Sequence, residues 1–331
     1  MLLAGDIGGT KTKLAVFSRE AGLHTPIAQE KYASDDYADF ESMARVFLKD
    51  FNISVDDIDI ARIGVAGPVV AGRAKVTNLP WVVAEDRLER ALELKSVKLL
   101  NDLEAIANGV PLLETDDLHT INAGTAFPDG AIAVIAPGTG LGEGYLTWDG
   151  QQYRGHSSEG GHTDFGPRNA LEMDMLQYLQ GRFGRVSYER ICSGIGIPNI
   201  YDFLRDEGYA DEPAWLAKQL TDSDDRTPII VSAAQDKSRP CSIGEKTLEV
   251  FISVLGSEAG NLALKVLSTG GVYLGGGIPP RMLDELTSST FMDAFLDKGR
   301  MSELLVKMPV HVILHPDVGL LGAAHHGFGG F

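Results

Sequence analysis

The chain has 331 residues, 44 % of them hydrophobic and 23 % charged, which are the proportions of an ordinary globular protein of about two domains. Its formal net charge of −17, with scattered lysines and arginines, argues against nucleic acid as a partner, because the phosphates would be repelled. No apolar run approaches the roughly 18 residues of a membrane span, and the two cysteines need form no disulfide, so we expect a cytoplasmic protein.

The chain opens with a glycine-rich bend between two apolar runs, which together predict a β-hairpin over residues 2–17. The bend is Gly8-Gly9-Thr10-Lys11. Its glycines would let the backbone approach an anion closely, because no Cβ intervenes, and Thr10 and Lys11 could donate to phosphate oxygens. Asp6, at the end of the first strand, could hold Mg²⁺ through water. The alternative is a tight hairpin that needs glycine for its geometry alone.

The next segments predict an α/β half-chain with a mixed sheet. The expected elements are helix 38–50, strand 58–66, a short strand at 73–76, helix 84–93, strand 97–100 and a helix from about 103. Asn101-Asp102 follows the last strand, where a carboxylate is well placed to accept a hydroxyl proton. Asn and Asp are also favoured helix N-caps, which is the structural alternative.

A second glycine-rich bend follows about 130 residues after the first, a spacing that suggests a duplicated unit. It contains Gly138-Thr139-Gly140 and lies within a hairpin predicted over 131–147. The chain has neither a GxxxxGK[ST] loop nor a GxGxxG after a strand, so the P-loop and dinucleotide-binding motifs are not expected. Two phosphate-sized bends with a carboxylate between them indicate a phosphotransferase.

The stretch 158–165 is the densest in polar groups. Glu159 and His162 could bind a polyhydroxylated ligand there, although a polar surface loop is the alternative, and no zinc-ligand spacing is present. Glu189 is interpreted most simply as a first-turn acid behind an N-cap serine.

The rest of the chain predicts further helices and strands. They are helices at 170–181, 187–192 and 196–207, a weakly periodic segment at 210–240 that is a candidate variable insertion, helix 243–268, strand 271–274, a helix after Pro279-Pro280, strand 310–314 and a final segment at 318–327. Gly275-Gly276-Gly277 follows strand 271–274 and could make room for a base or a ribose, or be an ordinary turn.

Taken in order, these motifs resemble the bacterial glucokinase family of the actin/hexokinase/sugar-kinase superfamily. The resemblance covers nearly the whole chain. The matching pieces are Gly5-Asp6-Ile7-Gly8-Gly9-Thr10, Leu100-Asn101-Asp102, Gly138-Thr139-Gly140-Leu141-Gly142, Glu159-Gly160-Gly161-His162, Ser187-Tyr188-Glu189-Arg190, Gly275-Gly276-Gly277-Ile278 and Gly319-Leu320-Leu321-Gly322-Ala323-Ala324.

The resemblance implies a role for each motif. Asp102 would be the general base on the sugar 6-hydroxyl, and Asp6 would organise Mg²⁺. The other sugar hydroxyls would be bound by Asn101, Glu159, His162 and Glu189. The phosphates of ATP would be cradled by Gly8, Gly9, Thr10, Gly138, Thr139 and Gly140, and the adenosine would lie by Gly275, Gly276 and Gly277. Lys11 stands where relatives often have Asn, which leaves its role open.

The resemblance also implies a two-domain, actin-like (ribonuclease H-like) α/β fold with a cleft between the domains. The small domain would comprise residues 1–111 plus 316–331, and the large domain residues 112–315. The reaction would be the transfer of the ATP γ-phosphate to D-glucose, and relatives suggest a homodimer. The related repressor/ORF/kinase family carries a cysteine-rich zinc motif that is lacking at 165–169, so we expect neither that family nor zinc.

Three alternatives stay open on the sequence alone. Another hexose or N-acetylhexosamine kinase of the same fold would differ only in hydroxyl acceptors that the sequence does not place. A non-catalytic sugar or nucleotide sensor would need a DNA-binding extension, for which the strand at residue 2 leaves no room. An actin-like ATPase would leave Glu159, His162 and Glu189 without a purpose.

Overall fold

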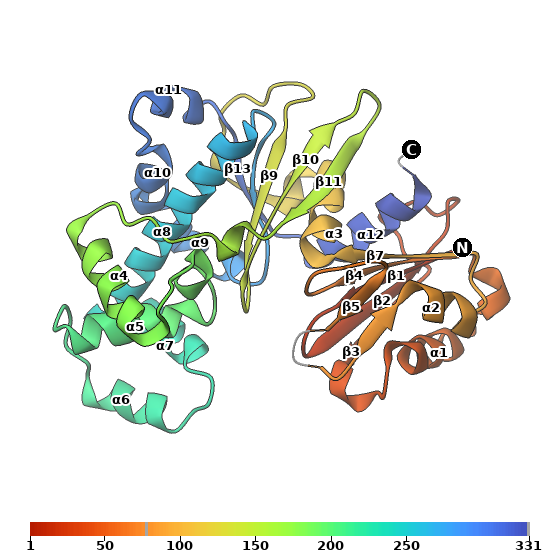
Figure 1. Ribbon diagram of the computed structural model, residues 1–331, viewed down its shortest axis with the longest axis horizontal. Helices are drawn as coiled ribbons and strands as arrows, with labels where there is room; N and C mark the ends of the chain where they lie inside the picture. The colour runs from red at the N-terminus through yellow and green to blue at the C-terminus, as the bar shows by residue number, and fades with distance from the viewer. Residues whose placement is uncertain (77–78, 330–331) are drawn as a thin grey trace. The chain divides into compact units, whose positions relative to one another are not determined.

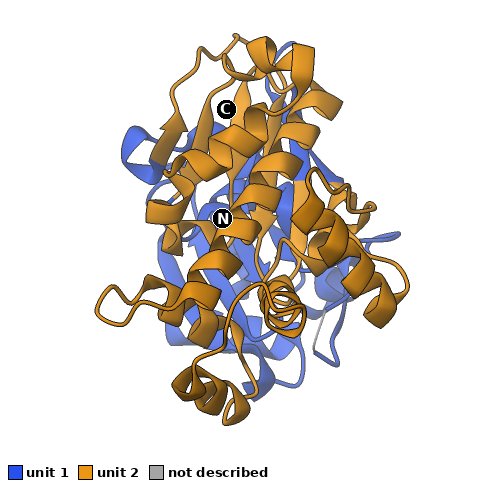
Figure 2. Ribbon diagram, turned by 90° about the vertical axis from the view of Figure 1, so that its left-hand side faces the viewer, with its two compact units in different colours: residues 1–118, 144–157, 314–331 blue, residues 119–143, 158–313 orange. Residues whose placement is uncertain are grey.

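The computed structural model describes residues 1–76 and 79–329, which form two compact units (Figure 2). Unit 1 comprises residues 1–118, 144–157 and 314–331, and unit 2 comprises residues 119–143 and 158–313. The domain bounds predicted from the sequence stay a prediction, since compactness alone does not define a domain. Part of the Asn78-Leu79-Pro80-Trp81 segment, namely residues 77–78, lies outside the described residues.

Unit 1 contains a mixed five-stranded sheet. Its strands in spatial order are β3 (Ala28–Ala33), β2 (Lys11–Phe17), β1 (Leu2–Ile7), β4 (Ile60–Val65) and β7 (Ser96–Asn101). β1 pairs with β2 in the antiparallel sense, as the predicted hairpin requires, and with β4 in the parallel sense. β4 pairs in parallel with β7. The carboxyl ends of β1, β4 and β7 therefore meet at one edge of the sheet.

Helices cover both faces of this sheet (Figure 1). Because successive side chains of a strand point to opposite faces, Leu3 and Ile7 of β1 pack with α1 (Phe40–Asp50) in one core, and Leu2 and Ala4 pack with α12 (Val318–Phe328) in another. α3 (Asp102–Gly109) packs along α12. The remaining elements of unit 1 are α2 (Glu85–Ala91) and the two-stranded sheet of β5 (Arg73–Lys75) and β6 (Val82–Ala84).

The second sheet has six strands. In spatial order they are β11 (Tyr153–Ser158), β10 (Leu141–Trp148), β9 (Ile132–Pro137), β12 (Gly271–Leu274), β13 (Val310–Ile313) and β8 (Leu118–Asn122). β12 pairs in parallel with both β9 and β13, so their carboxyl ends share an edge. The long helix α8 (Ser242–Val266) packs against β9 and β12.

Further helices of unit 2 surround α8. They are α4 (Ala170–Phe183), α5 (Gly196–Asp206), α6 (Ala214–Thr221), α7 (Thr227–Gln235), α9 (Leu283–Leu286), α10 (Ser289–Leu296) and α11 (Ser302–Leu305). α5, α7 and α10 contact α8 directly.

The predicted elements are largely confirmed, with three corrections. The segment 210–240 folds as the helices α6 and α7, whose apolar side chains Leu216, Leu220 and Ile230 are buried, so its weak periodicity concealed regular structure. The helix expected at 187–192 is only a 3₁₀ turn, Tyr188–Arg190. The strands β3, β6, β8 and β11 were not expected.

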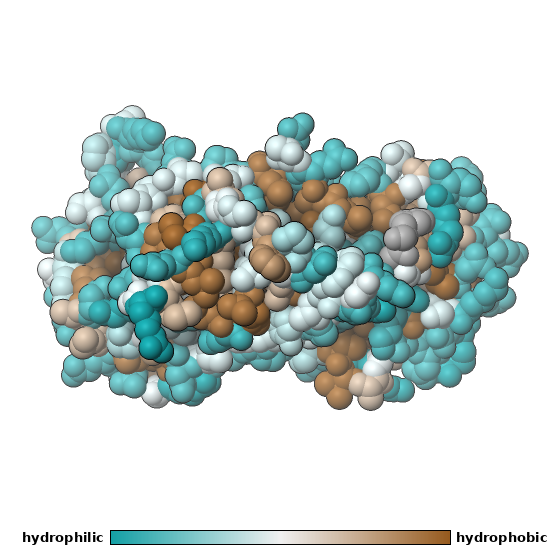
Figure 3. Space-filling model, turned by 90° about the horizontal axis from the view of Figure 1, so that it is seen from above, coloured by the Kyte–Doolittle hydropathy of each residue, from teal (hydrophilic) through white to brown (hydrophobic). Residues whose placement is uncertain are grey.

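The surface carries apolar side chains in both units. Val70 in unit 1 and Phe127 in unit 2 are the most exposed large ones among the described residues, at 70 % and 67 %. Figure 3 shows hydrophobic residues in separate patches among hydrophilic ones on the face that it presents. Within residues 1–76 and 79–329, no helix combines the length and the apolarity needed to cross a bilayer.

Candidate active site

The parallel strands of unit 1 bring two predicted carboxylates to one sheet edge. Ile7 of β1 is in register with Val65 of β4, which is in register with Asn101 of β7. Neighbouring strands lie about 4.8 Å apart, so the ends of β1 and β7 are separated by roughly 10 Å. Asp6 is adjacent to Ile7 and Asp102 is adjacent to Asn101, so both carboxylates lie at the same edge of the sheet of unit 1.

Of the pair Asn101 and Asp102, Asn101 is the residue that caps α3. Its Oδ1 accepts a hydrogen bond from Leu103 N at 3.0 Å, and its Nδ2 donates to Gly67 O at 3.1 Å. Asp102 is the first helical residue, is half-buried, and also accepts from Leu103 N at 3.0 Å. Because Asn101 serves as the cap, the helix does not require a carboxylate at position 102 for that purpose.

Asp6 lies on the α12 face of the sheet, beside the first turn of that helix. A Cβ on Gly319 would come within 3.4 Å of the Asp6 carboxylate, so glycine leaves space next to it. Burial raises the pKa of Asp6, and the neighbouring charge of Lys13 partly opposes this shift. Lys13 in turn donates to Asp317 at 2.7 Å.

Lys13 is a site candidate that the sequence reasoning missed. It is the register partner of Asp6 across the hairpin, and it lies two positions after the bend residue Lys11. The sequence contained the information needed to find Lys13. Residues two positions apart on a strand point to the same face, so Lys13 shares a face with Lys11, and a hairpin centred on the bend pairs Lys13 with Asp6.

The first glycine bend is closed by its own backbone. Gly8 N donates to Lys11 O at 3.0 Å, and Ser34 N donates to Thr10 O at 3.0 Å. Thr10 and Lys11 are exposed, so their side chains are accessible to a ligand. The bend satisfies the hairpin geometry and leaves the predicted donors at the surface of unit 1.

The second glycine bend is packed more tightly. Gly138 N donates to Gly140 O at 2.8 Å, and Gly194 N donates to Gly138 O at 2.7 Å. A Cβ on Gly140 would overlap Oε2 of Glu189, whereas a Cβ on Gly138 would meet no atom within 4 Å. Glycine at 140 thus admits the Glu189 carboxylate, and Gly138 with the exposed Thr139 lines open space.

The predicted adenosine segment adjoins this bend. Gly275 N donates to Ile135 O at 2.9 Å, which continues the β9–β12 pairing to the sheet edge. Gly276 has φ of +82° and packs on Pro137, so a side chain is disfavoured there on both counts. Gly277 has no atom within 4 Å of an added Cβ. The structure therefore brings the second bend and Gly275–Gly277 together.

Three predicted sugar ligands form one cluster in unit 2. His162 lies between two carboxylates, with Nε2 3.9 Å from Oε2 of Glu159 and Nδ1 3.8 Å from Oε1 of Glu189. Oε2 of Glu189 accepts from Leu141 N at 3.0 Å, which leaves Oε1 for other partners. The Glu189 side chain is only 22 % exposed, against 67 % for Glu159, so Glu189 is the more preorganised acceptor.

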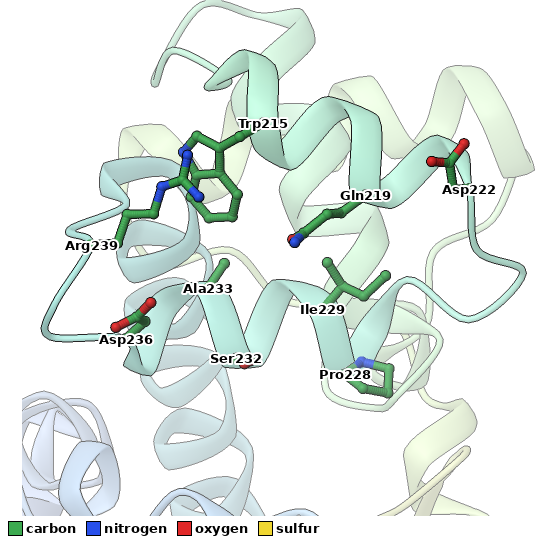
Figure 4. A pocket seen from close by; sticks show the side chains of 9 residues that line it. All are labelled: Trp215, Gln219, Asp222, Pro228, Ile229, Ser232, Ala233, Asp236 and Arg239. Carbon is green, nitrogen blue, oxygen red and sulfur yellow. The ribbon is translucent and has the colours of Figure 1, made fainter.

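A separate cavity of about 590 Å³ lies between α6 and α7 (Figure 4). The Arg239 guanidinium stacks on the Trp215 ring at 3.9 Å, at one end of this cavity. None of the cavity's lining residues belongs to the predicted site. In the described part of the chain, no group of three or more His, Cys, Asp or Glu side chains could hold a metal ion.

Known proteins match this chain over nearly its whole length. The family model named Glucokinase matches residues 3–327. A glucokinase of Nostoc punctiforme is 43 % identical over 338 residues, covering 98 % of each chain. The solved structure of a glucokinase from an Antarctic psychrotroph superposes with a TM-score of 0.82 at 31 % identity, over 98 % of this chain and 97 % of that one.

A more distant structure shares the fold. It is a ROK family glucokinase from Streptomyces griseus in complex with glucose and AMPPNP, with a TM-score of 0.62 at 20 % identity, over 98 % of each chain. The predicted actin-like α/β fold class is thereby confirmed, as is the predicted family resemblance.

Proposed function

The chain belongs to the glucokinase family, and on that premise we propose that it transfers the γ-phosphate of ATP to the 6-hydroxyl of D-glucose. The observation that carries the proposal is the family match over residues 3–327. The grouping of Glu159, His162 and Glu189 in one cluster supports it, because a polyhydroxylated substrate needs several acceptors in one place.

Asp102 is the proposed general base. The glucose O6 would attack the γ-phosphorus while its proton passes to the Asp102 carboxylate, and the bond from the γ-phosphorus to the bridging oxygen would break to release ADP. Phosphoryl transfer depends mainly on positioning and charge stabilisation, so a late proton transfer is sufficient. The partial positive charge at the first turn of α3 favours the ionised carboxylate that this role needs.

Mg²⁺ is the proposed metal, and when bound with ATP it neutralises phosphate charge. Asp6 would hold it, in part through water, since Mg²⁺ takes few protein carboxylates. The surroundings of Asp6 fit this role, because Gly319 leaves space beside the carboxylate and a cation would offset the cost of its burial. Lys13 would add positive charge near the phosphates.

The backbone bends are the proposed phosphate cradle. Gly8, Gly9, Thr10 and Lys11 would bind from unit 1, Gly138, Thr139 and Gly140 from unit 2, and Gly275–Gly277 would lie by the adenosine. In unit 2 this proposal is supported by the open space beside Gly138 and Gly277 at one sheet edge. That both bends face one pocket with Asp102 is part of the proposal.

A coupled assay with ATP and a panel of hexoses tests the function. We expect glucose to be turned over with the highest kcat/KM, because Asn101, Glu159, His162 and Glu189 are proposed to accept its hydroxyls. A higher value for mannose, fructose or an N-acetylhexosamine would instead favour the other kinases of this fold. ATP hydrolysis that is indifferent to sugar would contradict both.

We also propose a cytoplasmic homodimer. Cys192 and Cys241 are both buried and free, which is compatible with a reducing compartment. Light scattering after size exclusion would give a mass near 71 kDa for the dimer, twice the 35.6 kDa of the chain, and a mass of one chain would contradict it.

A further inference from the structure

Beneath the sugar-ligand cluster of unit 2 lies a pair of buried carboxyl groups that the proposed chemistry does not use. Glu143 of β10 is 1 % exposed, and Glu258 of α8 is fully buried. The negative charge of Glu258 adds to burial in raising the pKa of the Glu143 carboxyl group, which favours a proton on the pair. Oε1 of Glu143 is buried and has no hydrogen-bond partner among the described residues.

Glu143 supports the segment that carries Glu159 and His162. A Cβ on Gly160 would overlap Oε2 of Glu143, and one on Gly161 would overlap the carbonyl oxygen of Leu141. The turn Gly160–His162 therefore rests directly on the Glu143 carboxyl group and the neighbouring backbone. We therefore expect a movement of this carboxyl group to disturb the turn.

Glu258 extends the same support to Glu189. It accepts from Asn261 Nδ2 at 2.8 Å and from Lys265 Nζ at 3.0 Å. Asn261 Nδ2 also donates to the hydroxyl of Tyr188 at 3.0 Å, and Tyr188 directly precedes Glu189. Both segments that hold the sugar ligands thus rest on one carboxyl pair.

We propose that Glu143 and Glu258 are positioning residues that share a proton and so hold Glu189 and the Glu159–His162 turn in place for glucose. The proposal rests on the proposed function, because it assigns a role to residues beneath the sugar ligands. When the shared proton is lost, two negative charges face each other in a buried site. Repulsion then separates the groups and weakens glucose binding.

The charges around Glu143 and Glu258 determine the pH at which the shared proton is lost. Burial and the negative charge of Glu258 together raise the pKa of Glu143 to about 8, while the positive charge of Lys265 opposes the shift. The other titratable groups that interact with the pair or its immediate neighbours are Tyr188, Cys192, Glu172, Lys298, Arg168 and Asp297. Lys265 is half exposed and is the nearest positive charge.

The test is glucose binding to the full chain without nucleotide, measured by calorimetry from pH 6 to 9.5. The wild-type Kd should stay constant to about pH 8 and then rise, by up to about tenfold per pH unit. In the Glu143→Gln variant the side-chain amide can still donate a hydrogen bond to Glu258, but it cannot ionise. The Kd of this variant for glucose should therefore not change between pH 6 and 9.5. Glu172→Gln is the matched control, since Glu172 is also buried in unit 2 but has Arg168 as its partner.

Lys265→Met is a second variant, at a half-exposed position. It removes the positive charge that opposes protonation, so the rise in Kd should move to higher pH. A wild-type rise that persists in Glu143→Gln, or an unmoved midpoint in Lys265→Met, would overturn the proposal. Glucose binding that is constant with pH would overturn this inference alone, whereas no glucose binding at any pH would overturn the proposed function as well.

Discussion

The two sheet edges differ in what they present. The edge of unit 1 carries the carboxylates Asp6 and Asp102, beside the first turns of α12 and α3. The edge of unit 2 carries glycine backbone at Gly138 and Gly275–Gly277, and its acids serve as hydrogen-bond acceptors. We propose from this difference a division of labour, in which unit 1 would supply the base, the metal ligand and one phosphate bend, and unit 2 would supply the second phosphate bend and most of the sugar acceptors.

The largest expected effect is at Asp102, the proposed general base in unit 1. Asp102→Asn keeps the shape of the side chain but cannot accept the O6 proton, so kcat should fall by at least ~10² while glucose still binds. Asn101 remains the N-cap, so α3 should stay folded. Steady-state kinetics and glucose calorimetry measure the two quantities separately. Near-normal turnover would remove Asp102 from the mechanism.

Glu189→Ala tests the sugar-ligand cluster of unit 2. The loss of a half-buried charged acceptor should raise the KM for glucose by about 10- to 100-fold, because hydrogen bonds to charged groups contribute roughly 1.5–3 kcal/mol. Its effect on kcat should be smaller. If kcat fell while the KM for glucose stayed the same, Glu189 would belong with Asp102 in the chemical step.

A matched pair of glycine substitutions separates the two functions of the second bend. The methyl group of Gly140→Ala would displace the Glu189 carboxylate. Because this acceptor would be partly lost, the KM for glucose should rise by up to about tenfold. Gly138→Ala adds a methyl group in open space and should mainly raise the KM for ATP. Identical effects of the two variants on both substrates would contradict this separation.

The smallest expected effect is at the exposed Lys11. An exposed charge contact contributes about 0.2–1 kcal/mol, so Lys11→Ala should raise the KM for ATP by less than about fivefold. Lys13→Ala, at the partly buried neighbour of Asp6, should have the larger effect. An unaltered KM for ATP in Lys11→Ala would contradict a phosphate contact.

The sequence predicted those parts of the fold that depend on local pattern. The hairpin at 2–17, the strand that ends at Asn101 and the long helix α8 have strong apolar periodicity, and the structure contains each of them. β3 is an edge strand with mostly exposed side chains, and β11 is only partly buried, so neither shows the alternation that reveals a strand.

The site could be predicted only in part, for a related reason. A glycine motif in the sequence predicts a bend, but it does not predict which side chain fills the space beside each glycine. That Gly140 admits Glu189 and Gly160 admits Glu143 depends on segments that are 49 and 17 residues apart. The pairing of Glu143 with Glu258 likewise joins β10 to α8, and no local pattern encodes it.

A crystal structure of the protein with glucose and a non-hydrolysable ATP analogue tests the division of labour most directly. We predict that the glucose O6 lies within about 2.6–3.2 Å of an Asp102 carboxylate oxygen, and that backbone N–H groups of both glycine bends contact the phosphates. An O6 hydroxyl far from Asp102, or phosphates that contact neither bend, would contradict it.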